Sequence, residues 1–184
     1  MILNQDATAL QGDIDFDPTR FDGVWRLTKA DSTILDEQSG AMVQDTLTDQ
    51  WIERRMVGDV IHYKMHVQIA PDLTTHMGYE AKFNDKTWVP YTVVSIDGDE
   101  NDQRLQPGAE KLLKAGTIVG KPIAWVKVLY VDPWTQIRIS KNIDGTPQYV
   151  MQSRLSDDGN TLCGHVLTPS GKLLIDKAFQ RESD

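Results

Sequence analysis

DVIHYKMHVQIAPDLTTHMGYEAKF, at residues 59–83, is the stretch of the chain with the clearest structural pattern. Apolar and polar residues alternate along both halves, as in half-buried β-strands whose side chains point alternately to opposite faces. Pro71 and Asp72 favour a turn between the halves, because proline presets φ and aspartate can hydrogen-bond its own backbone. The mostly apolar positions are Ile61, Tyr63, Met65, Val67 and Ile69, followed by Leu73, Thr75, Met77, Tyr79, Ala81 and Phe83. The stretch therefore predicts two long antiparallel strands joined by a tight turn.

The register of this hairpin follows from the need to bury one face. A three-residue loop at 70–72 pairs polar with polar positions, so that His66 lies opposite His76 and His62 opposite Glu80. A loop with an even number of residues would pair polar with apolar positions, which a buried face does not allow. We therefore expect one face of tyrosine, methionine and aliphatic residues and another of histidine, lysine and glutamate.

Composition and charge restrict the class of protein. The chain has 184 residues, of which 40% are hydrophobic and 25% charged, as in a soluble domain with one sizeable core. The formal net charge of −8 argues against nucleic acid and anionic membrane surfaces as partners, because both favour a basic face. No run approaches the roughly twenty apolar residues of a membrane span. We therefore expect neither a nucleic-acid partner nor a membrane partner.

The N-terminus and the single cysteine bear on the cellular compartment. Residues 1–17, MILNQDATALQGDIDFD, are acidic and lack the basic start and the long apolar run of a signal peptide. A cytoplasmic location is therefore expected. Cys163 is the only cysteine, which excludes an intrachain disulfide. Because it lies among strand-like residues, we expect a buried, unreactive thiol.

Short strand-like segments separated by turn residues continue through the chain. Outside the hairpin they lie at residues 23–27, 46–57, 87–96, 123–131, 134–141, 149–155, 161–168 and 173–181. Residues 1–20 form an irregular lead-in with a helical turn near Pro18, and an insertion at residues 97–121 contains a short helix at 107–115. Successive strands joined by tight turns favour a meander, which closes into a barrel and so removes exposed edges. We predict an all-β fold in one domain spanning residues 1–184, an antiparallel up-and-down β-barrel of about eight to ten strands.

Three segments resemble the calycin superfamily, which contains the lipocalins and fatty-acid-binding proteins, and in particular small bacterial lipocalin-like domains. They are FDGVWRLTKADS at residues 21–32, YEAKFNDKTWVPYTV at 79–93 and the meander at 131–183 that begins VDPW and ends QRES. The resemblance implies a calycin-like barrel with an internal cavity for a small apolar or aromatic molecule. In calycins the opening tryptophan packs against an arginine of the final strand, and Trp25 and Arg181 match this pair. The insertion has no counterpart in the resemblance, and we expect it to cap the barrel mouth.

The apolar row of the hairpin supplies candidate cavity residues. Facing inward, these residues would line a pocket with apolar walls and a few hydroxyl groups that orient a ligand. The candidates are Tyr63, Met65, Met77 and Tyr79, joined from other strands by Trp88, Tyr91, Tyr149 and Met151. The alternative is that these side chains fill a solid core, and the sequence leaves both interpretations open.

The polar row contains three histidines, His62, His66 and His76, beside Glu80. Histidine is the commonest general acid or base, so this row is a candidate active site. However, lysines share the row and are rarely buried, which favours a solvent-facing surface. His62 and His66 are also about 13 Å apart along a strand, too far to bind one metal ion together. We expect no metal and no cofactor.

Four titratable residues elsewhere have ordinary interpretations. His165 on a late strand is expected to be a surface histidine or one with its hydrogen bonds satisfied. Glu53, Arg54 and Arg55 are interpreted as members of surface ion pairs between strands, although buried charges there would be functional candidates.

Two functions from different classes remain. The first is a protein that binds a small apolar or aromatic molecule in the barrel cavity. The second is a cofactor-independent enzyme, such as an isomerase, cyclase or lyase, that moves a proton within the same cavity. Tyr63 and Tyr79 are the first candidate proton donors, followed by His66 and His76 if the two faces of the hairpin are inverted. A purely structural module is disfavoured by the polar outer row, and the oligomeric state stays open.

Overall fold

The structure is a computed structural model that describes residues 16–106 and 116–183. Its helical parts within these residues are short 3-10 turns, namely η2 (Pro18–Phe21), η3 (Lys29–Asp31) and η4 (Gln103–Leu105). The turn η2 is the one expected near Pro18, and η4 lies within the predicted insertion. The helix expected at residues 107–115 and most of the lead-in lie outside the described residues.

Twelve strands of the described chain form one antiparallel sheet. They are β1 (Gly23–Leu27), β2 (Thr33–Leu35), β3 (Met42–Gln44), β4 (Asp49–Val57), β5 (Val60–Ala70), β6 (Leu73–Lys82), β7 (Val89–Asp97), β8 (Pro122–Asp132), β9 (Thr135–Lys141), β10 (Pro147–Leu155), β11 (Thr161–Leu167) and β12 (Leu173–Arg181). From β4 to β12 each strand pairs with the next one along the chain.

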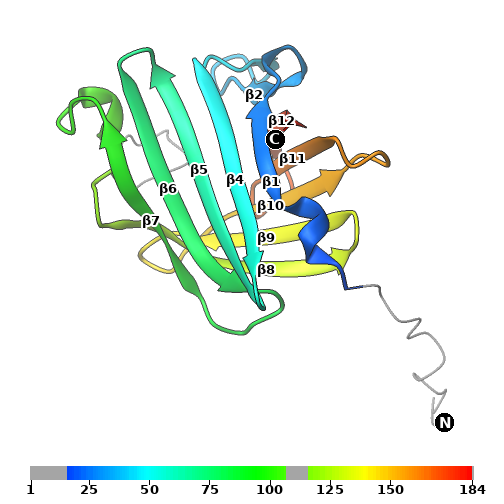
Figure 1. Cartoon of the computed structure of the whole chain (residues 1–184). Coiled ribbons are helices and arrows are strands. Elements are labelled where there is room, and N and C mark those ends of the chain that lie inside the picture. The colour runs from blue at the N-terminus through cyan, green and yellow to red at the C-terminus, as the bar shows by residue number, and fades with distance from the viewer. Residues whose placement is uncertain (1–15, 107–115, 184) are drawn as a thin grey trace, which may run out of the picture.

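Pairing of β1 with both β4 and β12 closes ten strands into a barrel. The short strands β2 and β3 extend the sheet from β12, where β2 pairs with Ile175 and Asp176 and β1 pairs farther along. Figure 1 shows β4 to β7 side by side on one side of the barrel, with β8 and β9 crossing behind them. The all-β antiparallel barrel predicted from the sequence is confirmed.

The β5–β6 hairpin has the predicted register. His66 pairs with His76 and His62 pairs with Glu80. The loop itself differs from the three-residue loop expected at 70–72. Ala70 still pairs with Leu73, and the extra residue lies in a bulge after Gln68. The bulge keeps apolar opposite apolar positions along the rest of the hairpin, as burial requires.

One end of the barrel is closed by η2. Phe21 and Trp25 are fully buried there, and the indole Nε1 of Trp25 donates a hydrogen bond to the carbonyl of Phe21 at 2.9 Å. Trp25 pairs with Arg181 across β1 and β12, and the guanidinium of Arg181 packs on the indole ring. The predicted contact between these two side chains is therefore confirmed.

Candidate functional site

A cavity of about 150 Å³ lies inside the barrel. Its walls are mostly apolar, with aliphatic and aromatic side chains from β4, β5, β8, β11 and β12 that include Ile52, Val67, Ile123, Val166 and Phe179. Five of the residues singled out from the sequence also line it, namely Tyr63, Met65, Tyr91, Tyr149 and Met151. The inward row of the hairpin thus borders an open space as well as a packed core.

The other predicted residues lie elsewhere. Tyr79 is buried and stacks on Tyr63, with ring centroids 4.7 Å apart, and it lines a second cavity of about 30 Å³ nearer to η2. Met77 is a buried core residue outside both of these cavities. Trp88 is half-buried and contacts two lysines, with the ammonium groups of Lys127 and Lys141 5.0 and 4.5 Å from its ring centroid.

The most unusual group at the cavity is the guanidinium of Arg138 on β9. The residue is only 6% exposed. Its Nη2 donates a hydrogen bond to the hydroxyl of Tyr149 at 3.0 Å and lies 3.3 Å from the sulfur of Met151. Its Nε and Nη1 are buried and have no hydrogen-bond partner in the described part of the chain. Buried polar groups normally have partners, so these donors call for an explanation.

Four tyrosine rings surround this cation. The Cζ of Arg138 lies 5.3 Å from the ring centroid of Tyr63, 5.8 Å from Tyr79, 5.2 Å from Tyr91 and 5.5 Å from Tyr149. Aromatic faces attract a cation, and each such contact contributes about 0.5–2 kcal/mol. The rings therefore lower the cost of burying the charge without neutralising it.

The hydroxyls of Tyr63, Tyr79 and Tyr91 stay protonated. Burial raises the pKa of Tyr63 to about 12 and also raises the pKa of Tyr79. Burial raises the pKa of Tyr91 well above its ordinary value. At neutral pH these groups are hydrogen-bond donors without charge, whereas arginine keeps its proton. The wall around Arg138 is consequently cationic.

A second cation, Lys177 on β12, lines the same cavity but is paired. Its Nζ lies 2.6 Å from a carboxylate oxygen of Asp45 and donates to the side-chain oxygen of Gln50 at 2.5 Å. Both partners are buried, so the ion pair is shielded from water. No aspartate or glutamate is among the described residues that line the cavity, and Arg138 has no carboxylate counter-ion there.

The sequence-based interpretation of Arg54 as a surface residue is wrong. Arg54 on β4 is 8% exposed and faces the interior, where it donates to Gln136 at 2.7 Å and to the carbonyl of Pro18 at 3.2 Å. The reason is strand parity, because Arg54 shares the inward face with Gln50 and Ile52. The adjacent Glu53 does face outward, as expected.

Arg138 was not predicted to be a cavity residue, because β9 has its polar side chains inside the barrel and its apolar side chains outside. Its inward positions are polar, Gln136, Arg138 and Ser140, whereas the apolar Ile137 and Ile139 lie on the other face. These inward polar positions could have been predicted from the pairing of β8 with β9, in which Val128 lies opposite Arg138. Directly opposed residues of an antiparallel pair share a face, so the inward Val128 places Arg138 inside.

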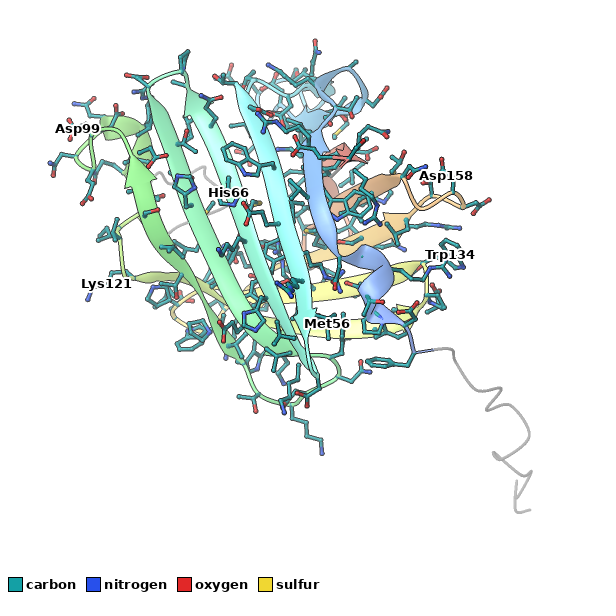
Figure 2. All side chains as sticks on the ribbon, in the orientation of Figure 1. Met56, His66, Asp99, Lys121, Trp134 and Asp158 are labelled. Atoms are coloured by element: carbon teal, nitrogen blue, oxygen red, sulfur yellow. The ribbon has the colours of Figure 1, made fainter. Side chains whose placement is uncertain are left out.

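The histidine row lies on the outer face, as the sequence favoured, and Figure 2 labels His66 on β5. The Nδ1 atoms of His66 and His76 are 2.6 Å apart, and their Nε2 atoms lie 3.3 Å from Glu53 and 2.9 Å from Asp97. The indole ring of Trp51 stacks on the imidazole ring of His66, with ring centroids 4.7 Å apart. This contact explains why His66 is largely buried although it lies on the outer face. Neither histidine borders the interior cavity.

The remaining candidates are surface pairs or unreactive groups. His62 lies 3.1 Å from Glu80, and His165 lies 3.1 Å from Asp176, each on the outer face. Cys163 is half-buried, and burial raises the pKa of its thiol, which disfavours the reactive thiolate. Among the described residues no group of three or more histidine, cysteine, aspartate or glutamate side chains could hold a metal ion.

The fold and the cavity define a closed antiparallel β-barrel with an interior pocket. No protein-family model matches the chain, and no curated protein matches it either. In the described residues no helix is long and apolar enough to cross a membrane.

Proposed function

We propose that the protein binds a small molecule with an apolar or aromatic body inside the barrel, as the calycin resemblance implies. The observation that carries this proposal is the cavity itself, whose walls combine aliphatic and aromatic side chains with a few tyrosine hydroxyls. Apolar walls with a small number of polar groups are the usual composition of ligand pockets.

The cavity volume limits the size of the ligand. Ligand pockets commonly measure about 300–1,000 Å³, and an apolar cavity of about 150 Å³ accommodates a single benzene ring. The cavity of about 150 Å³ in this barrel therefore suits one aromatic ring or a short aliphatic chain.

The alternative, a cofactor-independent isomerase, cyclase or lyase, receives less support. Proton transfer requires a group that titrates near neutral pH within reach of the substrate. No histidine or carboxylate is among the described residues that line the cavity, and burial raises the pKa of Tyr63 to about 12. The cavity is therefore better suited to holding a molecule than to removing a proton from it.

Gly164 offers a way to fill the cavity by mutation. It lines the cavity, and an added Cβ would lie 3.9 Å from the ends of Met151 and Phe179, an ordinary contact distance. Gly164→Leu would therefore place its side chain in the ligand's space. Cys163→Leu adds bulk at the neighbouring position, which faces outward, and is the matched control.

The test is titration with toluene, followed by NMR or calorimetry. The unmodified protein and Cys163→Leu are expected to bind toluene, and Gly164→Leu is expected to bind at least tenfold more weakly. Native mass spectrometry of protein purified from its own host should show a bound small molecule that Gly164→Leu lacks. Equal toluene binding by Gly164→Leu would contradict the proposal, and so would a failure of the unmodified protein to bind toluene or any other molecule of about one ring.

A further inference from the structure

We infer that the molecule bound in the cavity is a small organic acid, whose anionic group pairs with the guanidinium of Arg138. This inference rests on the proposed function, because it specifies the ligand of the same cavity. It is carried by a buried cation with unpaired donors on the cavity wall.

Among the residues that the structure describes, Arg138 has no counter-ion at the cavity. A buried charge is costly unless it is paired and hydrogen-bonded. Lys177 meets this condition through Asp45 at 2.6 Å, so that carboxylate is already engaged. The hydroxyl of Tyr149, at 3.0 Å, is the one tyrosine oxygen in good hydrogen-bond geometry with Arg138, and the hydroxyls of Tyr63 and Tyr79 interact with the guanidinium more weakly. The Nε and Nη1 donors have no partner of good geometry in the described chain.

Arg54 shows what a structural arginine looks like in the same barrel. It is also buried, but both of its terminal nitrogens donate to oxygen atoms, at Gln136 and at the carbonyl of Pro18. These contacts tie β4 to β9 and to η2, which gives Arg54 a role in closing the barrel end. Among the described residues, Arg138 bonds to one oxygen, that of Tyr149 on the adjacent strand, and two of its donors have no partner, whereas in Arg54 only Nε has none.

A second unpaired donor lies beside Arg138. The hydroxyl of Tyr91 is buried without a hydrogen-bond partner among the described residues, and Tyr91 lines the cavity. Its ring centroid lies 5.2 Å from the Cζ of Arg138. An oxyanion has several lone pairs and accepts hydrogen bonds from both groups at once, whereas a neutral apolar ligand would leave both unsatisfied.

Size separates this ligand from a long-chain lipid acid. The cavity of about 150 Å³ holds about one ring, and the anionic group occupies the end beside Arg138. The ligand class is therefore a monoanion of the dimensions of benzoate, with its ring against the apolar walls formed by residues such as Ile123 and Val166.

Benzoate and benzamide test the inference, because they have nearly the same shape and differ in charge. Calorimetric titration at pH 7.5 is expected to show that the unmodified protein binds benzoate at least tenfold more tightly than benzamide. Arg138→Met is expected to reduce the affinity for benzoate to that for benzamide and to leave benzamide binding unchanged. The matched control is Arg154→Met, which removes an exposed arginine from β10 and should not alter either affinity.

Tyr91→Phe is an independent variant, since it removes a hydroxyl and leaves the ring in place. It is expected to weaken benzoate binding several-fold without changing benzamide binding, and it tests the inference even if Arg138→Met does not fold. Equal affinities of the unmodified protein for benzoate and benzamide would overturn the inference and leave the proposed function standing.

Three further outcomes complete the test. If benzoate, benzamide and toluene all fail to bind the unmodified protein, the proposed function fails together with the inference. If palmitate binds far more tightly than benzoate, the assignment to a small acid is overturned. Preference for benzoate that survives Arg138→Met would overturn the role of this arginine.

Discussion

The guanidinium of Arg181 lies over the indole ring of Trp25, with its Cζ 4.1 Å from the ring centroid. The same guanidinium donates to the carbonyls of Arg20 at 2.7 Å and Gly159 at 3.1 Å, and to that of Asp22. One side chain from the last strand therefore holds the first strand, the turn η2 and the β10–β11 turn together.

Arg181→Lys is expected to lower the free energy of unfolding by about 1–3 kcal/mol, because an ammonium group cannot reach three separate carbonyls in this planar arrangement. Urea denaturation measures the change. Arg154→Lys, at an exposed position of β10, should leave the midpoint unaltered. A loss no greater in Arg181→Lys than in this control would show that the hydrogen bonds contribute little.

The buried pair of Lys177 and Asp45 should respond asymmetrically to mutation. Asp45→Asn leaves the ammonium without its counter-ion in a low-dielectric site and is expected to cost about 3–5 kcal/mol. The double variant Asp45→Leu with Lys177→Met removes both charges and is expected to recover most of that loss. Thermal denaturation of the single and double variants gives the comparison, and additive losses would contradict it.

In the β7–β8 connection, Gly98 is expected to tolerate a side chain less well than Gly120. It has a φ of +124°, and an added Cβ would collide with the backbone carbonyl oxygen of Asp72. Gly120 also has a positive φ, +76°, but an added Cβ would meet nothing within 4 Å. Gly98→Ala should therefore lose about 1–3 kcal/mol more stability than Gly120→Ala in chemical denaturation. Similar losses would mean that the backbone conformation alone sets the cost.

Stability should fall as the pH is lowered through the range in which histidine titrates. Burial lowers the pKa of His66 in the folded protein, and the positive charges of His76 and Lys64 act in the same direction, against the opposing effect of Glu53. The unfolded chain therefore takes up a proton near the ordinary histidine pKa of about 6.5, before folded His66 does. The contribution of His66 to stability is complete above that pH and is lost progressively on acidification toward the folded pKa.

Denaturant midpoints measured between pH 8 and pH 5 check this expectation. His66→Gln should show a smaller decrease in stability than the unmodified protein, because the proton-linked difference has been removed. His165→Gln alters a surface histidine that pairs with Asp176 and should keep the original pH dependence. If His66→Gln lost as much stability between pH 8 and pH 5 as the unmodified protein, the pH dependence would arise from other groups.

Arg138→Met is expected to keep or raise the stability of the ligand-free protein, by up to about 2 kcal/mol. The reason is that a buried cation with unpaired donors is replaced by an apolar side chain of similar length. Thermal denaturation without added ligand measures this directly. A large destabilisation would indicate that the tyrosine rings already compensate the charge fully.

Much of the fold was predictable because strand alternation is clear where one face is apolar. In the β5–β6 hairpin, Tyr63 and Met65 face the interior and His62 and Lys64 face outward, which the spacing alone predicts. The barrel then follows from the number of strands and the turns between them. The bulge near Ala70 was not predictable, because a three-residue loop gives the same pairing.

The site was predicted in part. Tyrosines and methionines of the cavity wall appear in the apolar rows, whereas Arg138 and Arg54 do not, because a rule that places charge outside assigns them to the wrong face. Both arginines lie in strands where apolar and polar residues alternate weakly or in reverse. In such strands, the face of a side chain is better predicted from the residue opposite it on a neighbouring strand with clear alternation. Local hydrophobicity fails at these positions because the tyrosine rings and neighbouring oxygen atoms, contributed by other strands, make burial of a cation tolerable.

Closure of the barrel joins positions that the ribosome produces far apart in time. Asp22 and Arg181, which share a hydrogen bond, are separated by 159 positions along the chain. At a synthesis rate of about 5–20 residues per second, the opening strand waits roughly 10–30 s for its partner. During that interval Arg181 has not yet been synthesised and cannot pack on the indole ring of Trp25. Pairing between strands so far apart in the sequence is also slow to form. We therefore expect strand insertion at this seam to be the last step of folding and the one most open to chaperone capture.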